Sequence, residues 1–263
     1  MVETTAEAVR KLFQSHRTVR KYTTEQIPQH VLEEAIEDAI VGGASSNNLT
    51  SFSFVVTRDH GIKEKLRPLH NNQPQVTDAS IVITVVADWF RTREWLKASN
   101  AADNYANFSS YNVALIDSII VAQNLVLALE SRGLGTCYLG STLSSQEAIS
   151  DILGLPETVV PVTTIAVGYP AEAPPQRDRL PIKAYIHNEQ YRSYNEEEIT
   201  ELFEFKDKYS WERQLAIPAI RNEIEEAGVQ NLAQFYTQLK NTEKRALARS
   251  RLIHDFIGYK GFG

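Results

Sequence analysis

The chain has 263 residues, enough for one large domain or two small ones, and its composition (43% hydrophobic, 23% charged) is that of an ordinary globular protein. Its formal net charge of −6 argues against nucleic acid or an anionic membrane as the main partner. A single cysteine, Cys137, excludes an intramolecular disulfide and a cysteine-based zinc site, which fits a reducing compartment.

The most apolar segment, residues 113–129, is interrupted by polar side chains, Asp117 among them. A membrane span needs about 20 predominantly apolar residues, so this segment predicts a buried helix. The first seven residues are acidic and lack the features of a signal peptide. We therefore expect a cytoplasmic protein with no membrane or nucleic-acid partner.

Hydrophobic periodicity and turn residues predict an irregular alternation of helices and strands. The predicted helices cover residues 7–15, 28–40, 62–70, 112–131 and 145–153. The predicted strands cover residues 52–57, 80–87, 137–141 and 159–167. Residues 90–111 are expected to form an irregular helical excursion. The pattern has too few strands for a barrel of eight units and indicates an α+β fold, a mixed sheet flanked by helices.

Two of these segments carry further expectations. Residues 80–87 are almost all apolar, which predicts a central strand buried on both faces. The helix over 112–131 is too apolar to face water on any side, so the core or a dimer interface must cover it. Composition becomes more polar after residue 185, and we expect a domain over 1–195 and a helical extension over 196–263 that packs on the same or the partner subunit.

A basic stretch, Ser15-His16-Arg17-Thr18-Val19-Arg20-Lys21-Tyr22, stands between the first two predicted helices. Arginine forks match phosphate oxygens, and Thr18 adds a hydroxyl. Alone, such a cluster is most often a solvated turn. A second pair, Arg177 and Arg179, lies far away in the sequence, and the two pairs together would form a phosphate site.

The familiar catalytic motifs are absent: the chain has no nucleophile elbow, His-Glu-x-x-His, Walker A loop or histidines at metal-ligand spacing. What remains is polar loops at predicted strand ends, over residues 45–50, 73–75 and 138–141. Each alone is more typical of a loop or a cap. Together with the arginine pairs they describe a phosphate anchor beside a planar pocket with polar edges, which predicts bound flavin mononucleotide (FMN) and explains the missing nucleophile.

The order of motifs carries a resemblance. The chain has His16-Arg17-Thr18-x-Arg20, then Ala44-Ser45-Ser46-x-Asn48-Leu49-Thr50, then Gly133-Leu134-Gly135-x-x-Tyr138-Leu139-Gly140, then Gly168-Tyr169-Pro170-Ala171. This order resembles the FMN-dependent nitroreductase family, and within it the oxygen-insensitive, NADPH-preferring nitroreductases and flavin reductases. Arg177-x-Arg179-Leu180-Pro181 resembles that branch's second phosphate anchor. The likeness covers roughly residues 5–190.

The resemblance implies a nitroreductase-like fold, with a mixed but mainly antiparallel sheet, in an intertwined homodimer whose two subunits share each site. The residues that would contact the phosphate and ribityl chain are His16, Arg17, Thr18 and Arg20, completed by Arg177 and Arg179. Those that would line the isoalloxazine are Ser45, Ser46, Asn48 and Thr50. Gln73 and Gln75 would meet the ring edge or ribityl chain. Backbone contacts near the flavin N5 and O4 would come from Tyr138, Leu139, Gly140 and Ser141.

The implied reaction passes a hydride from NADPH (or NADH) to the flavin and then to a nitroaromatic, a quinone or free flavin, by a ping-pong mechanism. No side chain stands out as an essential acid or base. Thr50 and Ser141 depart from the family, which often has Gln and a second Gly there, and this bears on substrate range. Arg213 and Arg221 are candidates for the 2′-phosphate of NADPH.

Three alternatives stay open at this point. The chain could be an FMN-dependent dehalogenase or dehydrogenase of the same fold. It could be a flavin-binding sensor or storage protein with little turnover. It could also bind a different phosphate ligand and no flavin.

Overall fold

The computed structural model describes residues 4–263, which form two compact units. The first unit holds residues 4–176 and 251–263, and the second holds Arg177–Ser250. The predicted domains, 1–195 and 196–263, stay a prediction. Most of the candidate site residues belong to the first unit, so its architecture matters most here.

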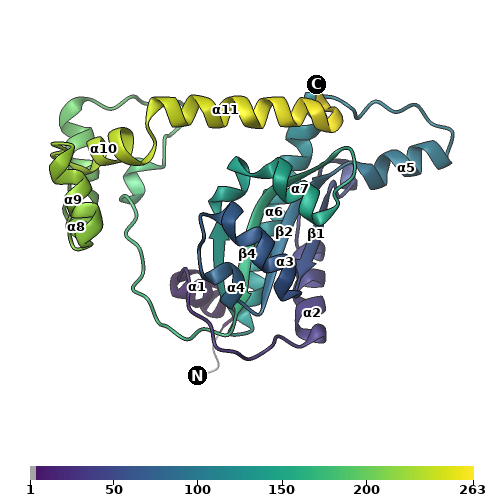
Figure 1. The fold of residues 1–263 in the computed structure, drawn as a ribbon, viewed down its shortest axis with the longest axis horizontal. Helices are drawn as coiled ribbons and strands as arrows, with labels where there is room; N and C mark the ends of the chain where they lie inside the picture. Colours follow the sequence, from purple (N-terminus) through teal and green to yellow (C-terminus); the bar gives the residue numbers. More distant parts are fainter. Residues whose placement is uncertain (1–3) are drawn as a thin grey trace. The chain divides into compact units, whose positions relative to one another are not determined.

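Four antiparallel strands form the sheet of the first unit (Figure 1). They are β1 (Phe52–Thr57), β2 (Ile81–Asp88), β3 (Gly135–Leu139) and β4 (Val159–Gly168), in the order β1-β2-β4-β3. Every residue of β2 and β4 is buried, which confirms the predicted central strand. The register between β2 and β4 shifts at Val85/Val86, opposite Pro161, which has no N–H to donate to the ladder.

Helices cover both faces of the sheet because side chains alternate along each strand. On one face Ile81, Ile83 and Val85 pack with α2 (Gln29–Val41) and α6 (Phe108–Ser131). On the other face Val82 and Ala166 pack with side chains from α3 (His60–Leu66), the Arg67–His70 turn, α4 (Gln75–Asp78) and α7 (Gln146–Leu153). The remaining helices of this unit are α1 (Thr5–Ser15), which starts with a capping box at Thr4, and α5 (Phe90–Ala98). The predicted α+β class is confirmed.

α6 is long and apolar enough to cross a membrane, judged by length and composition alone. In the structure it contacts all four strands, and 44% of its most apolar window is buried within the chain. Its apolar side chains Phe108, Ile116 and Ile119 are each at least half exposed. A single copy of the chain therefore covers only part of the helix.

One predicted strand needs correction. The strand expected over 137–141 ends at Leu139, and residues Gly140–Ser144 form a 3₁₀ turn. The Thr142 hydroxyl donates to the Leu139 carbonyl (2.8 Å) and closes this turn in place of a sheet contact. The irregular helical excursion expected over 90–111 is observed: it consists of α5, an irregular stretch, and the first turn of α6, which Asn107 caps by accepting from the Ser110 N–H.

The second unit is helical, with α8 (Glu196–Leu215), α9 (Pro218–Glu226), α10 (Leu232–Gln234) and a π-helical turn over Phe235–Lys240. Ile224, Val229 and Phe235 are buried together at its centre. α11 (Glu243–Ile257) begins in this unit, and its last residues belong to the first. There Phe256, Ile257 and Phe262, the last from a π turn over Gly258–Phe262, are buried with Trp89 and Tyr111.

Candidate functional site

The basic stretch runs along the free edge of β3. Thr18 forms a parallel bridge with Thr136, and the Val19 N–H donates to the Thr136 carbonyl (2.9 Å). Gly135 makes this approach feasible, because a Cβ there would lie 2.8 Å from the Cβ of Val19. The stretch is thus fixed to the sheet through its backbone, and its side chains are left for other contacts.

The cations of the stretch differ in what they contact. His16 Nδ1 lies 2.9 Å from Glu130 at the end of α6, and the same carboxylate accepts from the Thr136 hydroxyl (2.7 Å). Arg17 turns back and donates to the His16 carbonyl (2.8 Å). The Arg20 side chain is exposed and makes no hydrogen bond with any residue of 4–263, while its N–H is held by Glu172 (2.7 Å). Arg20 is therefore a cation with its donors available to an anion.

Asp117 of α6 organises the loop over residues 45–51. This carboxylate is 2% exposed and accepts hydrogen bonds from the hydroxyls of Ser45 (2.7 Å) and Ser51 (2.8 Å) and from the N–H groups of Ser46 (3.2 Å) and Ser51 (3.4 Å). Charge-assisted bonds of this kind are strong ones. Ser45 thus supports the loop with its hydroxyl, while Ser46 is exposed beside it.

The same loop holds strained backbone. Asn47, Asn48 and Thr50 have φ of 51°, 55° and 49°, a region that Asn tolerates and a β-branched residue rarely enters. Thr50 is kept there from both sides: its N–H donates to Ser45 Oγ (2.7 Å), and its carbonyl accepts from Arg91 (2.5 Å). Strain held in place by surrounding contacts is typical of ligand-binding loops.

Two further polar segments lie at β3: residues 73–75 contact the strand, and residues 138–141 include its end and the turn that follows. Gln75 is buried, and its amide donates to the Gln73 side chain (2.5 Å) and lies 3.9 Å from the Cys137 sulfur. Tyr138 and Leu139 close the strand, with Leu139 buried and Tyr138 partly exposed. Gly140 follows, exposed and with open space where a Cβ would stand, so the backbone there is accessible to a ligand.

Ser141 has a buried partner that the sequence did not reveal. His70 is fully buried, and its Nδ1 lies 2.9 Å from Ser141 Oγ. Burial lowers the pKa of His70 to about 4, so the ring is neutral at physiological pH. Its Nε2 is buried without a hydrogen-bond partner among residues 4–263.

Within one copy, the candidate residues form two groups. Residues 16–20, 73–75 and 138–141 gather along β3, whereas the loop over 45–51 leads into β1 at the opposite edge of the sheet. α6 carries one partner of each group, Glu130 and Asp117, which lie about 20 Å apart along the helix at roughly 1.5 Å per residue. One copy does not bring all the predicted ring and phosphate contacts together.

Arg177 and Arg179 belong to the second unit and are exposed. Arg179 donates to the Asp178 carbonyl (3.1 Å). Of the two 2′-phosphate candidates, Arg213 pairs with the Asp178 carboxylate (3.7 Å), and Arg221 donates to the Leu215 carbonyl (2.8 Å).

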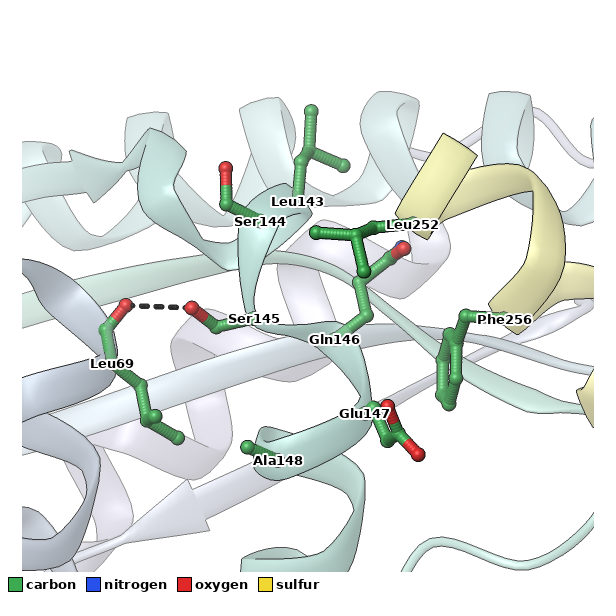
Figure 2. A pocket seen from close by; sticks show the side chains of 9 residues that line it. All are labelled: Leu69, Leu143, Ser144, Ser145, Gln146, Glu147, Ala148, Leu252 and Phe256. Atoms are coloured by element: carbon green, nitrogen blue, oxygen red, sulfur yellow. Dashed lines mark hydrogen bonds between the residues drawn. The ribbon is translucent and has the colours of Figure 1, made fainter. Parts of the chain in front are cut away.

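A separate pocket of about 220 Å³ lies next to the Gly140–Ser144 turn (Figure 2). Its lining residues are Leu69, Leu143, Ser144, Ser145, Gln146, Glu147, Ala148, Leu252 and Phe256. None of the sixteen predicted cofactor residues is among them, so this pocket is distinct from the predicted site. Figure 2 also shows Ser145 donating to the Leu69 carbonyl (3.0 Å).

Comparison with known proteins gives consistent matches. Residues 13–169 match the model of the nitroreductase family. A curated NADPH-dependent oxidoreductase from Staphylococcus epidermidis is 30% identical over 201 residues, covering 75% of this chain and 79% of that protein. An FMN reductase (NADPH) from Bacillus subtilis is 29% identical over 179 residues, covering 67% of this chain and 72% of its own length. A solved structure from Bacteroides fragilis, 36% identical, has a TM-score of 0.87 and covers 96% of this chain and 99% of its own.

Proposed function

Because this chain belongs to the nitroreductase family, we propose that it is an FMN-dependent oxidoreductase that takes a hydride from NADPH and reduces small oxidants. The family match over residues 13–169 covers the first three motifs and the start of the fourth, and the resemblance to this family is confirmed. Relatives named NADPH-dependent oxidoreductase and FMN reductase (NADPH) support NADPH as donor and FMN as cofactor.

The proposal rests on one observation: three groups of polar residues lie together at β3. A cation with available donors (Arg20), a polar amide pair (Gln73 and Gln75) and an accessible backbone turn (Gly140 and Ser141) come from three distant parts of the sequence to one strand edge. This donor set fits FMN: arginine suits a phosphate, and amide and backbone groups suit the acceptor-rich edge of a planar ring.

When bound, FMN supplies the redox chemistry, accepting a hydride from NADPH and passing electrons to a nitroaromatic, a quinone or free flavin in a ping-pong cycle. The side chains and backbone of this protein bind the FMN phosphate and orient its ring. Arg20 and Thr18 hold the phosphate, and the second anchor, Arg177 and Arg179, stays a prediction. His16 and Arg17 shape the anchor, since their side chains contact Glu130 and the local backbone. Residues 138–141 and Gln73 orient the ring.

We propose that the working form is a homodimer, in which the loop over residues 45–51 of one subunit completes the site built on β3 of the other. The separation of about 20 Å between the two groups along α6 supports this, at roughly 1.5 Å per residue. The exposed apolar side chains Ile116 and Ile119 give a helix face that a second copy would cover.

The first test is the visible absorbance spectrum of the purified protein, before and after anaerobic addition of NADPH. We expect flavin bands that bleach with NADPH and return with a quinone. Bands that bleach but do not return would favour a flavin sensor or storage protein. A protein that shows no flavin bands, even after incubation with FMN, would contradict the proposal and leave the basic stretch to another phosphate ligand.

A further inference from the structure

His70 joins two turns that reach the β3 site. Its carbonyl accepts from the Gln73 N–H (3.1 Å), and its ring nitrogen Nδ1 lies 2.9 Å from Ser141 Oγ. The neighbouring residue forms a second link, because the Leu69 carbonyl accepts from the Ser145 hydroxyl (3.0 Å; Figure 2). Two hydrogen bonds therefore fix the turn over Arg67–His70 to the segment 141–145, and the bond from His70 is the one nearer to the proposed ring contacts.

The burial of His70 decides which of its nitrogens carries the hydrogen. A neutral imidazole has one N–H and one acceptor nitrogen. With the hydrogen on Nε2, a fully buried N–H would lack a partner, since Nε2 has none among residues 4–263. Buried N–H groups without partners are rarer than under-satisfied acceptors, and an unmade bond at a buried donor costs about 1–3 kcal/mol. The hydrogen therefore belongs on Nδ1.

This tautomer fixes the role of the serine. With Nδ1–H as the donor, Ser141 Oγ is the acceptor, and the hydroxyl hydrogen of Ser141 remains for a bond elsewhere. With the opposite tautomer, the Ser141 hydroxyl would donate its hydrogen to Nδ1 and have none left for a ligand. Ser141 is half-buried in the accessible turn beside Gly140, so its hydrogen can reach a ligand acceptor.

We propose that His70 is a positioning residue: it donates from Nδ1 to Ser141 and so presents the Ser141 hydroxyl as a hydrogen-bond donor to the FMN ring. The inference rests on the proposed function, because it needs FMN at the β3 site. It adds a residue whose side chain acts on the cofactor through the Ser141 hydroxyl.

The test uses the full-length protein and four variants. Ser141→Ala removes the donor, His70→Leu removes the link at similar bulk, and His70→Asn keeps an amide donor near the position of Nδ1. His30→Leu, at an exposed histidine of α2, is the matched control. The readouts are the midpoint potential of bound FMN and its dissociation constant, measured by titrating FMN into flavin-depleted protein.

A donor to the ring favours the electron-rich reduced flavin, so losing it lowers the potential. We expect Ser141→Ala and His70→Leu to shift the potential to more negative values by similar amounts and to weaken FMN binding roughly three- to tenfold, the equivalent of one hydrogen bond. His70→Asn should restore most of both values, and His30→Leu should match wild type. The Ser141→Ala/His70→Leu double variant should shift no further than either single one.

An unchanged potential in His70→Leu, or additive shifts in the double variant, would overturn the inference while leaving the FMN proposal intact. Wild-type protein that binds no FMN would instead overturn the proposed function. If His70→Leu does not fold, the ¹⁵N resonances of wild-type His70 decide the matter. The Nδ1–H tautomer supports the assignment, and the Nε2–H tautomer contradicts it.

Discussion

Arg17 and Arg20 stand three residues apart in one basic stretch, yet their guanidinium groups differ in what they can do. Arg17 donates to the carbonyls of Gln14 (3.2 Å) and His16 (2.8 Å), so part of its fork supports the local backbone. Arg20 has all its side-chain donors available to a ligand within the described chain. The sequence alone cannot distinguish these roles, because they depend on how the stretch lies against β3.

The double variant Arg20→Ala/Arg179→Ala tests the phosphate anchor. Each lost charge-assisted hydrogen bond costs about 1.5–3 kcal/mol, so we expect this protein to purify with little flavin. The measurement is the ratio of flavin to protein absorbance after purification. The exposed Arg251, changed to Ala, serves as control and should keep the wild-type ratio. Full FMN occupancy in the double variant would contradict the anchor assignment.

His70 predicts a specific sensitivity to acid. Its pKa is about 4 in the folded protein and 6.5 when unperturbed, so between these values the unfolded state binds more protons. The stability gained from keeping His70 neutral is fully present above pH 6.5 and is lost as the pH falls through 4. The loss amounts to about 3 kcal/mol for a shift of this size. Urea unfolding with a constant excess of FMN measures it.

The comparison for this effect is His70→Asn, which has no titrating side chain at this position. Its free energy of unfolding should fall less steeply than that of wild type between pH 6.5 and 4. Parallel curves for the two proteins would show that His70 is not the group responsible.

At the scale of elements, the loop over residues 45–51 depends on a side chain from another part of the chain. Asp117→Ala leaves the buried Ser51 hydroxyl and the loop N–H groups near Asp117 without their acceptor. We expect the free energy of unfolding to fall by at least about 2 kcal/mol, with faster hydrogen exchange over residues 45–51. Asp117→Asn, which keeps one acceptor oxygen, should lose less.

A matched control for this variant is Asp151→Ala, at an exposed aspartate of α7, which should stay within about 0.5 kcal/mol of wild type. If Asp117→Ala leaves both stability and the exchange of the loop unchanged, the loop is held by Arg91 and its own turns.

Local sequence was enough to find the main elements. The predicted strand over 52–57 has the observed bounds, and the predicted strands over 80–87 and 159–167 agree with β2 and β4 to within one residue, because β-branched and apolar runs are typical of strands. The strand predicted over 137–141 lies two residues earlier, at Gly135–Leu139, and its end is set by the Thr142 hydroxyl, a contact that no periodicity shows. The sequence predicts helices over residues 196–263, where α8 to α11 lie, but it does not predict their bounds.

The supporting residues of the site were missed for a different reason. In the sequence Asp117 is a polar interruption in an apolar run, His70 is the last residue of a predicted helix, and Glu130 belongs to no motif. Their contacts with Ser51, His16 and Ser141 span 66 to 114 residues, so nothing in the local pattern identifies these contacts. The ligand-facing residues could be proposed from motifs, and whether they contact FMN stays a prediction.

At the scale of the whole molecule, the proposed homodimer can be tested at α6. Changing Ile116 and Ile119 to Glu would place two charges in the proposed interface, where burying them is costly. We expect a monomer that binds little FMN, measured by light scattering after size exclusion and by flavin absorbance. Ile182→Glu, at an exposed isoleucine of the second unit, is the control and should leave the wild-type mass. A dimer that survives the double change would place the interface elsewhere.

α6 has a consequence for how this protein can change over evolution. The helix fixes the distance between two carboxylates: Asp117, near its middle, orders the loop over residues 45–51, and Glu130, in its last turn, contacts the basic stretch. One residue inserted between Asp117 and Glu130 would turn one end relative to the other by about 100°. Either set of hydrogen bonds could then be kept, but not both. Around α6, insertions should therefore occur in the irregular stretch between α5 and α6, where added residues do not change the distance between Asp117 and Glu130.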